Sequence, residues 1–358
     1  MVNALLALLL ATGPSDLLGR AVPAVEEACG AKFDTPPEVR IVSEEEAVEA
    51  FTEDLGPQVR RLYPTARTGQ IRALLAASAM GSARSCIARY SPSRKAVLIV
   101  RTSFETQAAS LGVAPEEREM LLLSVLSHEA VHALDDRRFD LAARYSGAAD
   151  REALRAVSLV IEGRALHFGR AAAERLSVPE KIRGILPGGT SPEGERELFL
   201  NLSYRAGAEF IAALVRRGGR ELADRALREP PLLTHHLFHP ERWPAEAADA
   251  RPGEMLRAAF PESAPQPLSE LELRVRYGDL DGLPAAEALF ADYRGGAQAL
   301  VEGTNVAVLA FADEAAAERF LRRSLRDVPA ERRGTLVLRA AGPSAAALVN
   351  HLGSEREK

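Results

Sequence analysis

The sequence predicts an α+β protein in which a mainly helical body carries a short β-sheet and is followed by a small α+β unit. Helical periodicity, with apolar residues every three or four positions, dominates residues 16–262, which we expect to form the body. Within it, the β-branched run at residues 96–100 predicts a strand. The pattern changes after Pro261, and short strand patterns with one helical pattern fill residues 263–358. Residues 1–15 form a separate apolar leader.

The composition excludes several classes of protein. Hydrophobic residues make up 47% of the 358 residues and charged residues 27%, the balance of a soluble globular protein and not of a disordered, collagen-like or multi-span membrane protein. The formal net charge is -5, so no overall positive field is available to hold a phosphate backbone, and we expect no nucleic-acid partner. Beyond the leader, no stretch predicts a transmembrane span. The oligomeric state stays open.

The first residues predict export. An apolar run at residues 5–11 ends in Ala-Thr-Gly before Pro14, which is the pattern of a signal peptide and its cleavage site. No lysine or arginine precedes the run, so the first turns of a buried helix are the alternative. We expect an exported protein of the periplasm, the cell envelope or the medium rather than a cytoplasmic one. Cys29 and Cys86 are too few for a disulfide framework or a thiolate metal site, and they form either one bridge or two buried thiols.

The elements of the body have recognisable signals. Pro115 and the two glutamates after it begin a helix, because proline fits the first helical turn and acidic residues complement the helix dipole. Asp150 is a suitable N-cap for a second helix that runs through Ala165, and a third helix ends at Gly218 and Gly219. The other predicted elements are a helical pattern in residues 16–54 with an extended piece at 39–42, helical residues 44–75, a turn at 91–94, a helical continuation at 120–126, a loop at 188–192, the start of the third helix at 195 and a Pro- and His-bearing stretch at 230–240.

Three signals define the C-terminal unit. Residues 299–310 predict a hairpin around Gly303, residues 313–326 predict a helix, and residues 335–340 predict another strand. We therefore expect this unit to be a small α+β fold beside the helical body.

His128, Glu129 and His132 form a His-Glu-x-x-His motif inside an otherwise apolar helical stretch. Two histidines four residues apart lie one turn above each other on one face of a helix, so both imidazoles can bind one tetrahedral ion. The carboxylate of Glu129 can then reach a water molecule on that ion without binding the ion itself. The alternative is a pair of core histidines hydrogen-bonded to the backbone, which leaves polar groups in an apolar segment without a bound ion to compensate them.

A catalytic zinc ion needs a third protein ligand and one open position. Glu162 is our candidate, because it is a lone carboxylate in an apolar helical stretch thirty residues after His132, and the small residues after it let the helix pack close to the metal. An ordinary exposed glutamate and a ligand role for His167 are the alternatives. We expect one zinc ion (Zn2+) per chain, bound by His128, His132 and Glu162.

The segment around this motif, Leu126 to Leu141, resembles the His-Glu-Leu-x-His-Ala-Leu-Gln-Asp-Gln-x-Phe-Asp-Leu segment of a largely uncharacterised family of bacterial gluzincin-like zinc metallopeptidases. Further pieces over about residues 85–245 are similar to segments of this family. Tyr90-Ser91-Pro92 with the strand at Ala96 resembles its Tyr-Asp-Pro turn and edge strand, and Val160 to Gly163 resembles its third-ligand helix. Tyr204-x-x-Gly207 resembles its Tyr-x-x-Gly helix, and Pro230 to Trp243 resembles its His-Pro-Glu-Lys-Tyr loop. The family's Gln-Asp-Gln is Asp135-Asp136-Arg137 here, and its Ser-Thr-Glu-Gln is Leu233-Thr234-His235-His236. These departures put contacts around the metal and to substrate in doubt, whereas no inferred zinc ligand is lost.

The resemblance implies a zinc-activated water that attacks a peptide carbonyl, with Glu129 as the general base. It also implies a second donor to the oxyanion, for which His239 and Tyr204 are the candidates. His235 and His236 are expected to be side chains of the same loop and not ligands.

A carboxylate that orients a metal-binding histidine is a further expectation from the better-known gluzincins such as thermolysin. Leu166 stands where that carboxylate would follow the third ligand. Asp135 or Asp136 is therefore expected to take this part, and the alternative is that both are solvated charges at the end of the helix.

Together these inferences predict a hydrolase, a zinc metalloprotease that acts on a peptide or protein substrate. The strand at residues 96–100 is expected to pair with an extended substrate, unless it is only a core or edge strand. The alternative function is a catalytically inactive, exported zincin-like protein that serves as a binding or assembly factor. Glu129 favours the peptidase, because a purely structural zinc site does not need it.

Overall fold

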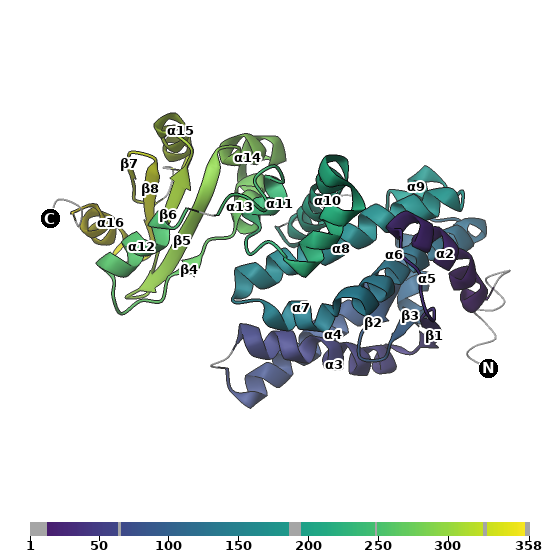
Figure 1. The fold of residues 1–358 in the computed structure, drawn as a ribbon. Coiled ribbons are helices and arrows are strands. Elements are labelled where there is room, and N and C mark those ends of the chain that lie inside the picture. Colours follow the sequence, from purple (N-terminus) through teal and green to yellow (C-terminus); the bar gives the residue numbers. More distant parts are fainter. Residues whose placement is uncertain (1–12, 64–65, 186–194, 248, 325–327, 355–358) are drawn as a thin grey trace. The chain divides into compact units, whose positions relative to one another are not determined.

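The computed structural model describes residues 13–63, 66–185, 195–247, 249–324 and 328–354 (Figure 1). It is 64% helical and 13% strand, with the strands in two small sheets, which confirms the predicted α+β class with a helical body. The predicted leader lies outside the described residues up to residue 12, and its last two residues belong to the first helix, α2 (Pro14–Cys29).

The chain divides into two compact units. Unit 1 comprises residues 1–192 and 203–232, and unit 2 comprises residues 193–202 and 233–358. Helix α12 (Arg251–Ala259) belongs to unit 2, where Met255 and Leu256 pack in the core of its sheet. The boundary predicted after residue 262 lies inside unit 2, because the prolines there connect α12 to a strand of the same unit.

Unit 1 consists of helices around a three-stranded sheet. Its helices are α2, α3 (Glu44–Leu62), α4 (Thr68–Ser85), α5 (Arg101–Ser110), α6 (Arg118–Phe139), α7 (Leu141–Gly147), α8 (Arg151–Arg175), α9 (Glu180–Arg183) and most of α10 (Glu195–Arg228), with a 3-10 turn at Pro115–Glu117 before α6. Its strands are β1 (Glu38–Val42), β2 (Ala88–Ser91) and β3 (Ala96–Val100). The side chain of Asp150 accepts a hydrogen bond of 2.9 Å from the backbone N–H of Ala153, so the predicted N-cap of α8 is confirmed.

Strand β3 is the central strand of this sheet. It runs parallel to β1 and antiparallel to β2, in the order β1-β3-β2. Every side chain of β3 is buried, as expected for a strand that is covered on both faces. Since both edges of β3 are paired, the prediction that residues 96–100 pair with an extended substrate is wrong, and β2 is the edge strand on that side of the sheet.

Helices α6, α8 and α10 approach one another closely at glycines. A Cβ on Gly169 of α8 would lie 3.0 Å from the Cα of His128 on α6. A Cβ on Gly163 of α8 would lie 2.2 Å from the carbonyl oxygen of Gly207 on α10. A side chain at either glycine would therefore force the helices apart. Gly163, the small residue directly after Glu162, thus packs against α10, whereas the close approach to α6 is made at Gly169.

Helix α10 contains the break predicted at Gly218 and Gly219. Gly219 has φ 69° and ψ -166°, so two helical segments meet there. Of the described helices, one stretch, Leu198–Arg228, is long and apolar enough to cross a membrane by length and composition, although the sequence predicts no span. Nearly half of its most apolar window is buried, and Phe210 and Leu214 on it are fully covered. A core helix passes the same test, so the evidence for a span is weak.

Unit 2 is built on a five-stranded antiparallel sheet with the order β4-β5-β6-β8-β7. Its strands are β4 (Gln266–Pro267), β5 (Tyr293–Val301), β6 (Thr304–Phe311), β7 (Ala330–Arg333) and β8 (Leu336–Ala341). Its helices are α11 (His235–Phe238), α12, α13 (Glu270–Asp281), α14 (Leu283–Phe290), α15 (Glu314–Ser324) and α16 (Ala345–Ser354). The hairpin, helix and strand predicted from the sequence are β5 with β6, α15 and β8.

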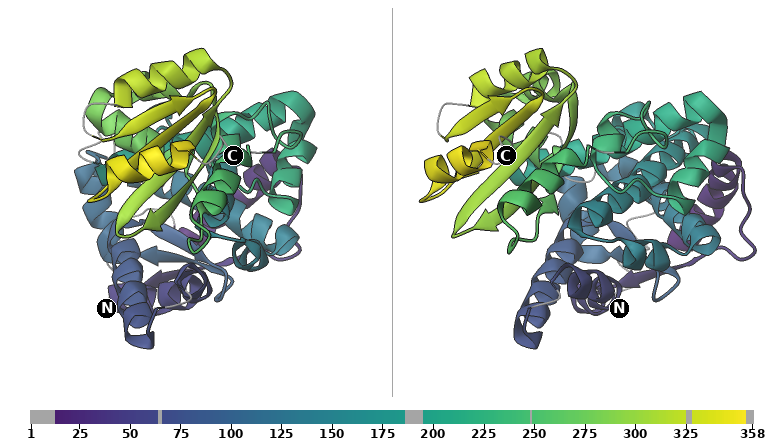
Figure 2. Two further views of the ribbon diagram at one scale, coloured as in Figure 1. Left: turned by 90° about the vertical axis from the view of Figure 1, so that its left-hand side faces the viewer. Right: turned by 60° about the vertical axis from the view of Figure 1, so that its left-hand side comes forward.

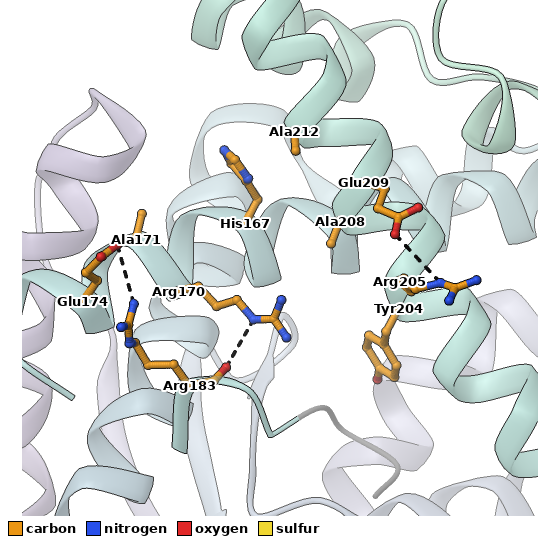
Figure 3. A pocket seen from close by; sticks show the side chains of 10 residues that line it. All are labelled: His167, Arg170, Ala171, Glu174, Arg183, Tyr204, Arg205, Ala208, Glu209 and Ala212. Carbon is orange, nitrogen blue, oxygen red and sulfur yellow. Dashed lines mark hydrogen bonds and ion pairs between the residues drawn. The ribbon is translucent and has the colours of Figure 1, made fainter. Parts of the chain in front are cut away.

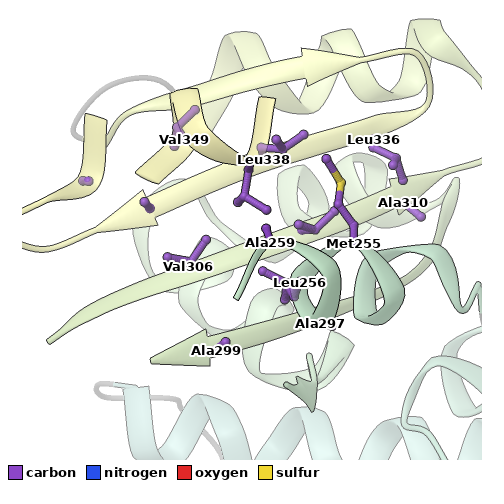
Figure 4. Packing of buried hydrophobic residues seen from close by; sticks show 14 residues of the cluster. Met255, Leu256, Ala259, Ala297, Ala299, Val306, Ala310, Leu336, Leu338 and Val349 are labelled. Atoms are coloured by element: carbon purple, nitrogen blue, oxygen red, sulfur yellow. The ribbon is translucent and has the colours of Figure 1, made fainter. Parts of the chain in front are cut away.

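Each face of this sheet has its own apolar core. On one face, α12 and α16 pack on Val306 and Ala310 of β6 (Figure 4). On the other face, Leu309 and Phe311 of the same strand pack against α13, α14 and α15. Figure 2 shows the sheet lying between these helices. The alternation along β6 is the two-residue period of a strand with both faces buried.

Candidate metal centre

Helix α6 places two histidine rings one turn apart in unit 1. The Nε2 atoms of His128 and His132 lie 3.1 Å apart, and the ring centroids lie 4.7 Å apart. The two side chains are 15% and 11% exposed, so the rings are shielded from solvent but not sealed from it. The structure therefore brings the two predicted ligands of α6 together on one face.

Helix α8 brings Glu162 to the same place. Its Oε2 lies 3.4 Å from Nε2 of His128 and 3.5 Å from Nε2 of His132. Glu162 reaches both rings because α8 crosses α6 at Gly169, where the backbones nearly touch. The three residues proposed from the sequence as zinc ligands thus present three donor atoms to one point.

The spacing of these donors fits a tetrahedral zinc ion. Donors about 2.0–2.1 Å from a tetrahedral ion are separated from one another by roughly 3.3 Å. The observed edges of the donor triangle are 3.1, 3.4 and 3.5 Å. The two edges to the carboxylate are longer than an ordinary charge-assisted hydrogen bond of about 2.7–2.9 Å. Two imidazoles and one carboxylate, with the fourth side left to solvent, also match a catalytic rather than a closed structural site.

The donors stabilise one another electrostatically. Burial alone lowers the pKa of His132, but the Glu162 carboxylate outweighs burial and raises that pKa to about 9. Burial alone raises the pKa of Glu162, but the two histidines hold it well below its ordinary range. Glu162 is therefore an anion over the physiological pH range, which is the form in which a carboxylate binds a metal ion.

Glu129 lies beside the donor triangle without belonging to it. Its Oε2 accepts a hydrogen bond of 2.6 Å from the backbone N–H of Tyr90 in β2, and the residue is 6% exposed. No described residue donates a hydrogen bond to its Oε1. One carboxylate oxygen is thus fixed, and the other is available to accept a proton.

Asp135 and Asp136 do not orient a histidine. Asp135 binds the guanidinium of Arg164 with two hydrogen bonds of 2.8 and 2.9 Å, and both side chains are fully buried. Asp136 accepts hydrogen bonds from the Tyr90 hydroxyl at 2.9 Å and from Lys95 Nζ at 2.6 Å. Of the described residues, no histidine is bonded to either aspartate. The two aspartates instead fix α6 to α8 and to the sheet.

Tyr204 is a neighbour of the centre, and its role as an oxyanion donor stays a prediction. It lies on α10 one turn before Gly207, the residue that touches α8 beside Glu162. Burial and then the negative charges of Glu162 and Glu129 raise its pKa well above the ordinary value. The Tyr204 hydroxyl therefore keeps its proton and can donate a hydrogen bond.

His167, the rival third ligand, does not join the donor triangle. It lies on α8 beyond Glu162, and among the described residues the convergent donors in this unit come from His128, His132 and Glu162 alone. Burial and the positive charges of Arg164 and of a second arginine lower the pKa of His167.

No sequence pattern marks Tyr145, which is a further neighbour of the centre. It lies on α7, and burial followed by the negative charge of Glu162 raises its pKa. The sequence also does not predict that the backbone N–H of Tyr90 donates a hydrogen bond to Glu129. Both relations depend on tertiary packing, and only the apolar strand pattern near Tyr90 gives an indirect signal.

Unit 2 contains a second group of histidines around a carboxylate. His235 Nδ1 lies 2.8 Å from Glu270, and His239 Nε2 lies 3.1 Å from it. Arg274 occupies the same carboxylate at 2.7 Å, and Arg242 lies 3.2 Å from the other ring nitrogen of His235. With these short contacts, the two histidines, the glutamate and the two arginines form a hydrogen-bonded cluster, which fixes the loop of His235 and His239 to α13.

His236 is also a side chain of this loop, and its Nε2 lies 2.8 Å from the backbone carbonyl oxygen of Glu246. The expectation that His235 and His236 serve the loop agrees with these contacts. His239 belongs to unit 2 and is bonded to Glu270, a partner that no motif marks. Its role as an oxyanion donor stays a prediction.

No family model matches the chain, and no curated protein and no solved structure is found to be similar to it. The resemblance to gluzincin-like metallopeptidases therefore stays a prediction from the sequence motifs.

Proposed function

We propose that the protein is a zinc-dependent metallopeptidase of the gluzincin type. The observation that carries the proposal is the donor triangle of His128, His132 and Glu162, whose edges of 3.1, 3.4 and 3.5 Å match a tetrahedral zinc ion. Glu129 supports it, because a carboxylate beside the triangle and outside it is what a general base requires.

The residues of the site have separate tasks in this proposal. Zinc bound there supplies Lewis acidity, since it lowers the pKa of a water molecule to about 7 and polarises a carbonyl group. Glu129 takes a proton from the attacking water through Oε1 and returns it to the leaving amine. The hydrogen bond from Tyr90 N–H holds the other oxygen of Glu129 in place. The Tyr204 hydroxyl donates a hydrogen bond to the oxygen that becomes negative and keeps its proton.

Strand β2 gives an extended substrate a place beside Glu129. The N–H of Tyr90 points to Glu129 and not to β3, so it lies on the unpaired edge of β2. A peptide that pairs with this edge by main-chain hydrogen bonds passes next to the Glu129 carboxylate. The substrate proposed is accordingly a peptide or an unfolded segment of a protein, which can adopt an extended conformation.

Metal content and hydrolysis of a peptide library test the proposal on matched variants. The purified protein should bind about one zinc ion per chain and cleave peptides. Glu129→Gln should keep the zinc and lower kcat by at least roughly 10²–10⁴-fold, because it removes only the base. His132→Ala and Glu162→Gln should lose stoichiometric zinc. His167→Ala is the control, and it should keep both zinc and activity.

Each unfavourable result has a clear meaning. Full zinc occupancy in His132→Ala would show that the ligands are wrong. A protein that binds zinc through these residues but cleaves no peptide would favour the inactive binding or assembly factor. Unchanged hydrolysis in Glu129→Gln would remove the proposed mechanism.

A further inference from the structure

Unit 1 contains a pocket of about 440 Å³ (Figure 3). Helices α8 and α10 form its walls, and Arg183 of α9 lines it as well. Tyr204 connects the two sites, because it lines this pocket and is also subject to the charges of Glu162 and Glu129. A ligand in this pocket would therefore lie next to a residue that we propose to act at the metal centre.

Arg170 is the residue of this pocket that the proposed mechanism does not use. It follows Glu162 by eight residues on α8, which is roughly 12 Å along the helix axis. Side chains on a helix lean toward its N-terminus, and Figure 3 shows Arg170 directed toward the side of the pocket where Tyr204 lies. The guanidinium is thus within about two to four extended residues of the donor triangle, at roughly 3.3 Å per residue.

The guanidinium of Arg170 has no counterion among the residues that the structure describes. Its Nε donates a hydrogen bond of 3.2 Å to the backbone carbonyl oxygen of Arg183, and no carboxylate of a described residue lies within salt-bridge distance. Burial lowers the pKa of Arg170, and no negative charge acts against this effect. A half-buried cation without a counterion is unfavourable, and an anionic ligand would supply that counterion.

The other charges of the pocket do not compete for Arg170. Glu174 pairs with Arg183 at 3.5 Å, and Glu209 pairs with Arg205 at 3.8 Å. Their negative charges are balanced, so the charge of Arg170 remains in excess. All three arginines of the pocket are half-buried, and Arg170 is the one of them that pairs with no carboxylate of the described residues.

From this geometry we infer that the pocket binds a carboxylate of the peptide substrate through Arg170. The inference rests on the proposed peptidase function and names its substrate class, peptides with a carboxylate within about two to four residues of the scissile bond. The carboxylate belongs to an acidic side chain or to the free C-terminus, and both sources offer the same two oxygens to a guanidinium.

Two series of peptides distinguish the sources. In the first, Glu replaces Gln at successive positions of a blocked peptide; in the second, the same sequence ends in a free acid or in an amide. We expect the carboxylate-bearing member to be cleaved with a kcat/KM about 10- to 100-fold higher at one position or at one distance from the C-terminus. The series that shows the preference identifies the source.

Arg170→Gln should abolish this preference, so that acidic and neutral peptides are cleaved with equal kcat/KM. Arg175→Gln is the matched control, because Arg175 ends the same helix, is exposed and pairs with Glu27 outside the pocket. Arg170→Lys, which keeps the charge, should retain part of the preference. Thermal unfolding of all three variants shows whether a loss comes from damage to the fold.

A binding measurement makes the test independent of turnover. The Glu129→Gln protein should bind the acidic peptide at least about tenfold more tightly than the neutral one, and Arg170→Gln in that background should make the two equal. Equal cleavage and equal binding of acidic and neutral peptides would overturn the inference and leave the peptidase standing. Absence of cleavage of every peptide by the zinc-loaded native protein would refute the peptidase, and with it this inference.

Discussion

The contact between α8 and α10 at Gly163 makes a prediction about both stability and activity. In Gly163→Ala, the added Cβ would lie 2.2 Å from the carbonyl oxygen of Gly207 and 2.3 Å from its carbonyl carbon. A carbon and an oxygen in contact require about 3.3 Å. The clash is with backbone, so no side chain can turn aside, and the helices must separate by roughly 1 Å.

The magnitude follows from a comparison with a glycine that has free space. Gly19 lies on the exposed side of α2, and a Cβ there would meet nothing within 4 Å. Gly19→Ala should therefore raise the free energy of unfolding by about 0.5–1 kcal/mol, the ordinary gain in a helix. Gly163→Ala has the same gain but adds an overpacking cost of about 1–3 kcal/mol or more. Since the gain is common to both, we expect the two variants to differ by roughly 1–3 kcal/mol, with Gly163→Ala the less stable.

Urea denaturation followed by circular dichroism measures this difference, and both substitutions lie in unit 1. Activity gives a second reading, because the separation of α8 from α10 moves Tyr204 away from Glu162. A misplacement of about 1 Å at a catalytic site can cost about a hundredfold in rate. Equal urea midpoints for the two variants, with full activity in both, would refute the close packing described for these helices.

Three other predictions concern charge and thiols. Asp135→Asn leaves the fully buried Arg164 without one of its charged partners, and urea denaturation should show a loss of roughly 3–5 kcal/mol in the free energy of unfolding; an unchanged midpoint contradicts this. Burial alone raises the pKa of Glu270, but hydrogen bonds from two histidines and an arginine lower it from 4.5 to about 2. A carboxyl group with a lowered pKa stabilises the fold at pH values above its ordinary pKa, and this stabilisation is lost as the pH falls. In denaturation curves, the stability advantage of the native protein over Glu270→Gln should therefore be full at pH 7 and shrink between about pH 4.5 and 2. A stability difference that does not depend on pH would rule this out. Cys29 and Cys86 are unpaired and burial raises the pKa of both thiols to about 12, so a thiol reagent at about pH 8 should react slowly with the native protein and find two thiols after unfolding; a disulfide in the purified protein would be the contrary result.

The convergence of the three donors of the candidate metal centre could be predicted from the sequence because their relations are local or nearly so. His128 and His132 come together wherever their segment is helical, because they lie one turn apart, and the apolar pattern around them predicts a helix. Glu162 requires a return helix, and its start is marked by the Asp150 cap that the structure contains. Small residues after Glu162 indicate a close crossing, and Gly169 makes it against α6.

The order of the strands could not be predicted in the same way. The run at residues 96–100 is apolar throughout, and this pattern fits either a central strand or an edge strand that is covered on both faces. Its partner β1 pairs Glu38 with Ala96, a contact between distant parts of the sequence that no local signal records. The edge beside Glu129 is consequently β2, whose short length gives it a weak pattern.

The boundary between the two units could not be predicted for a similar reason. Prolines between residues 261 and 267 interrupt the helical pattern, and such a cluster is typical of a linker. Helix α12 lies before the cluster but has its apolar side chains in the core of the C-terminal sheet. Which sheet an amphipathic helix covers depends on the complementary face of that sheet, and a helical pattern alone does not identify it.

The two groups of two histidines and one glutamate show why residue types alone cannot identify a metal site. In unit 1, the donors of His128, His132 and Glu162 are 3.1 to 3.5 Å apart, and no described lysine or arginine is bonded to the carboxylate. In unit 2, the carboxylate of Glu270 is bound directly at 2.8 Å by a histidine and at 2.7 Å by Arg274.

A metal ion at Glu270 would have to displace the guanidinium of Arg274, which is 7% exposed as a side chain and would then be buried without its counterion. A metal ion at Glu162 displaces no cation and replaces two long contacts by coordination bonds. The second site therefore has less to gain from zinc although it contains the same ligands. Titration of the native protein with zinc should accordingly reach saturation near one equivalent, and His132→Ala, with the Glu270 cluster intact, should show no tight site at all.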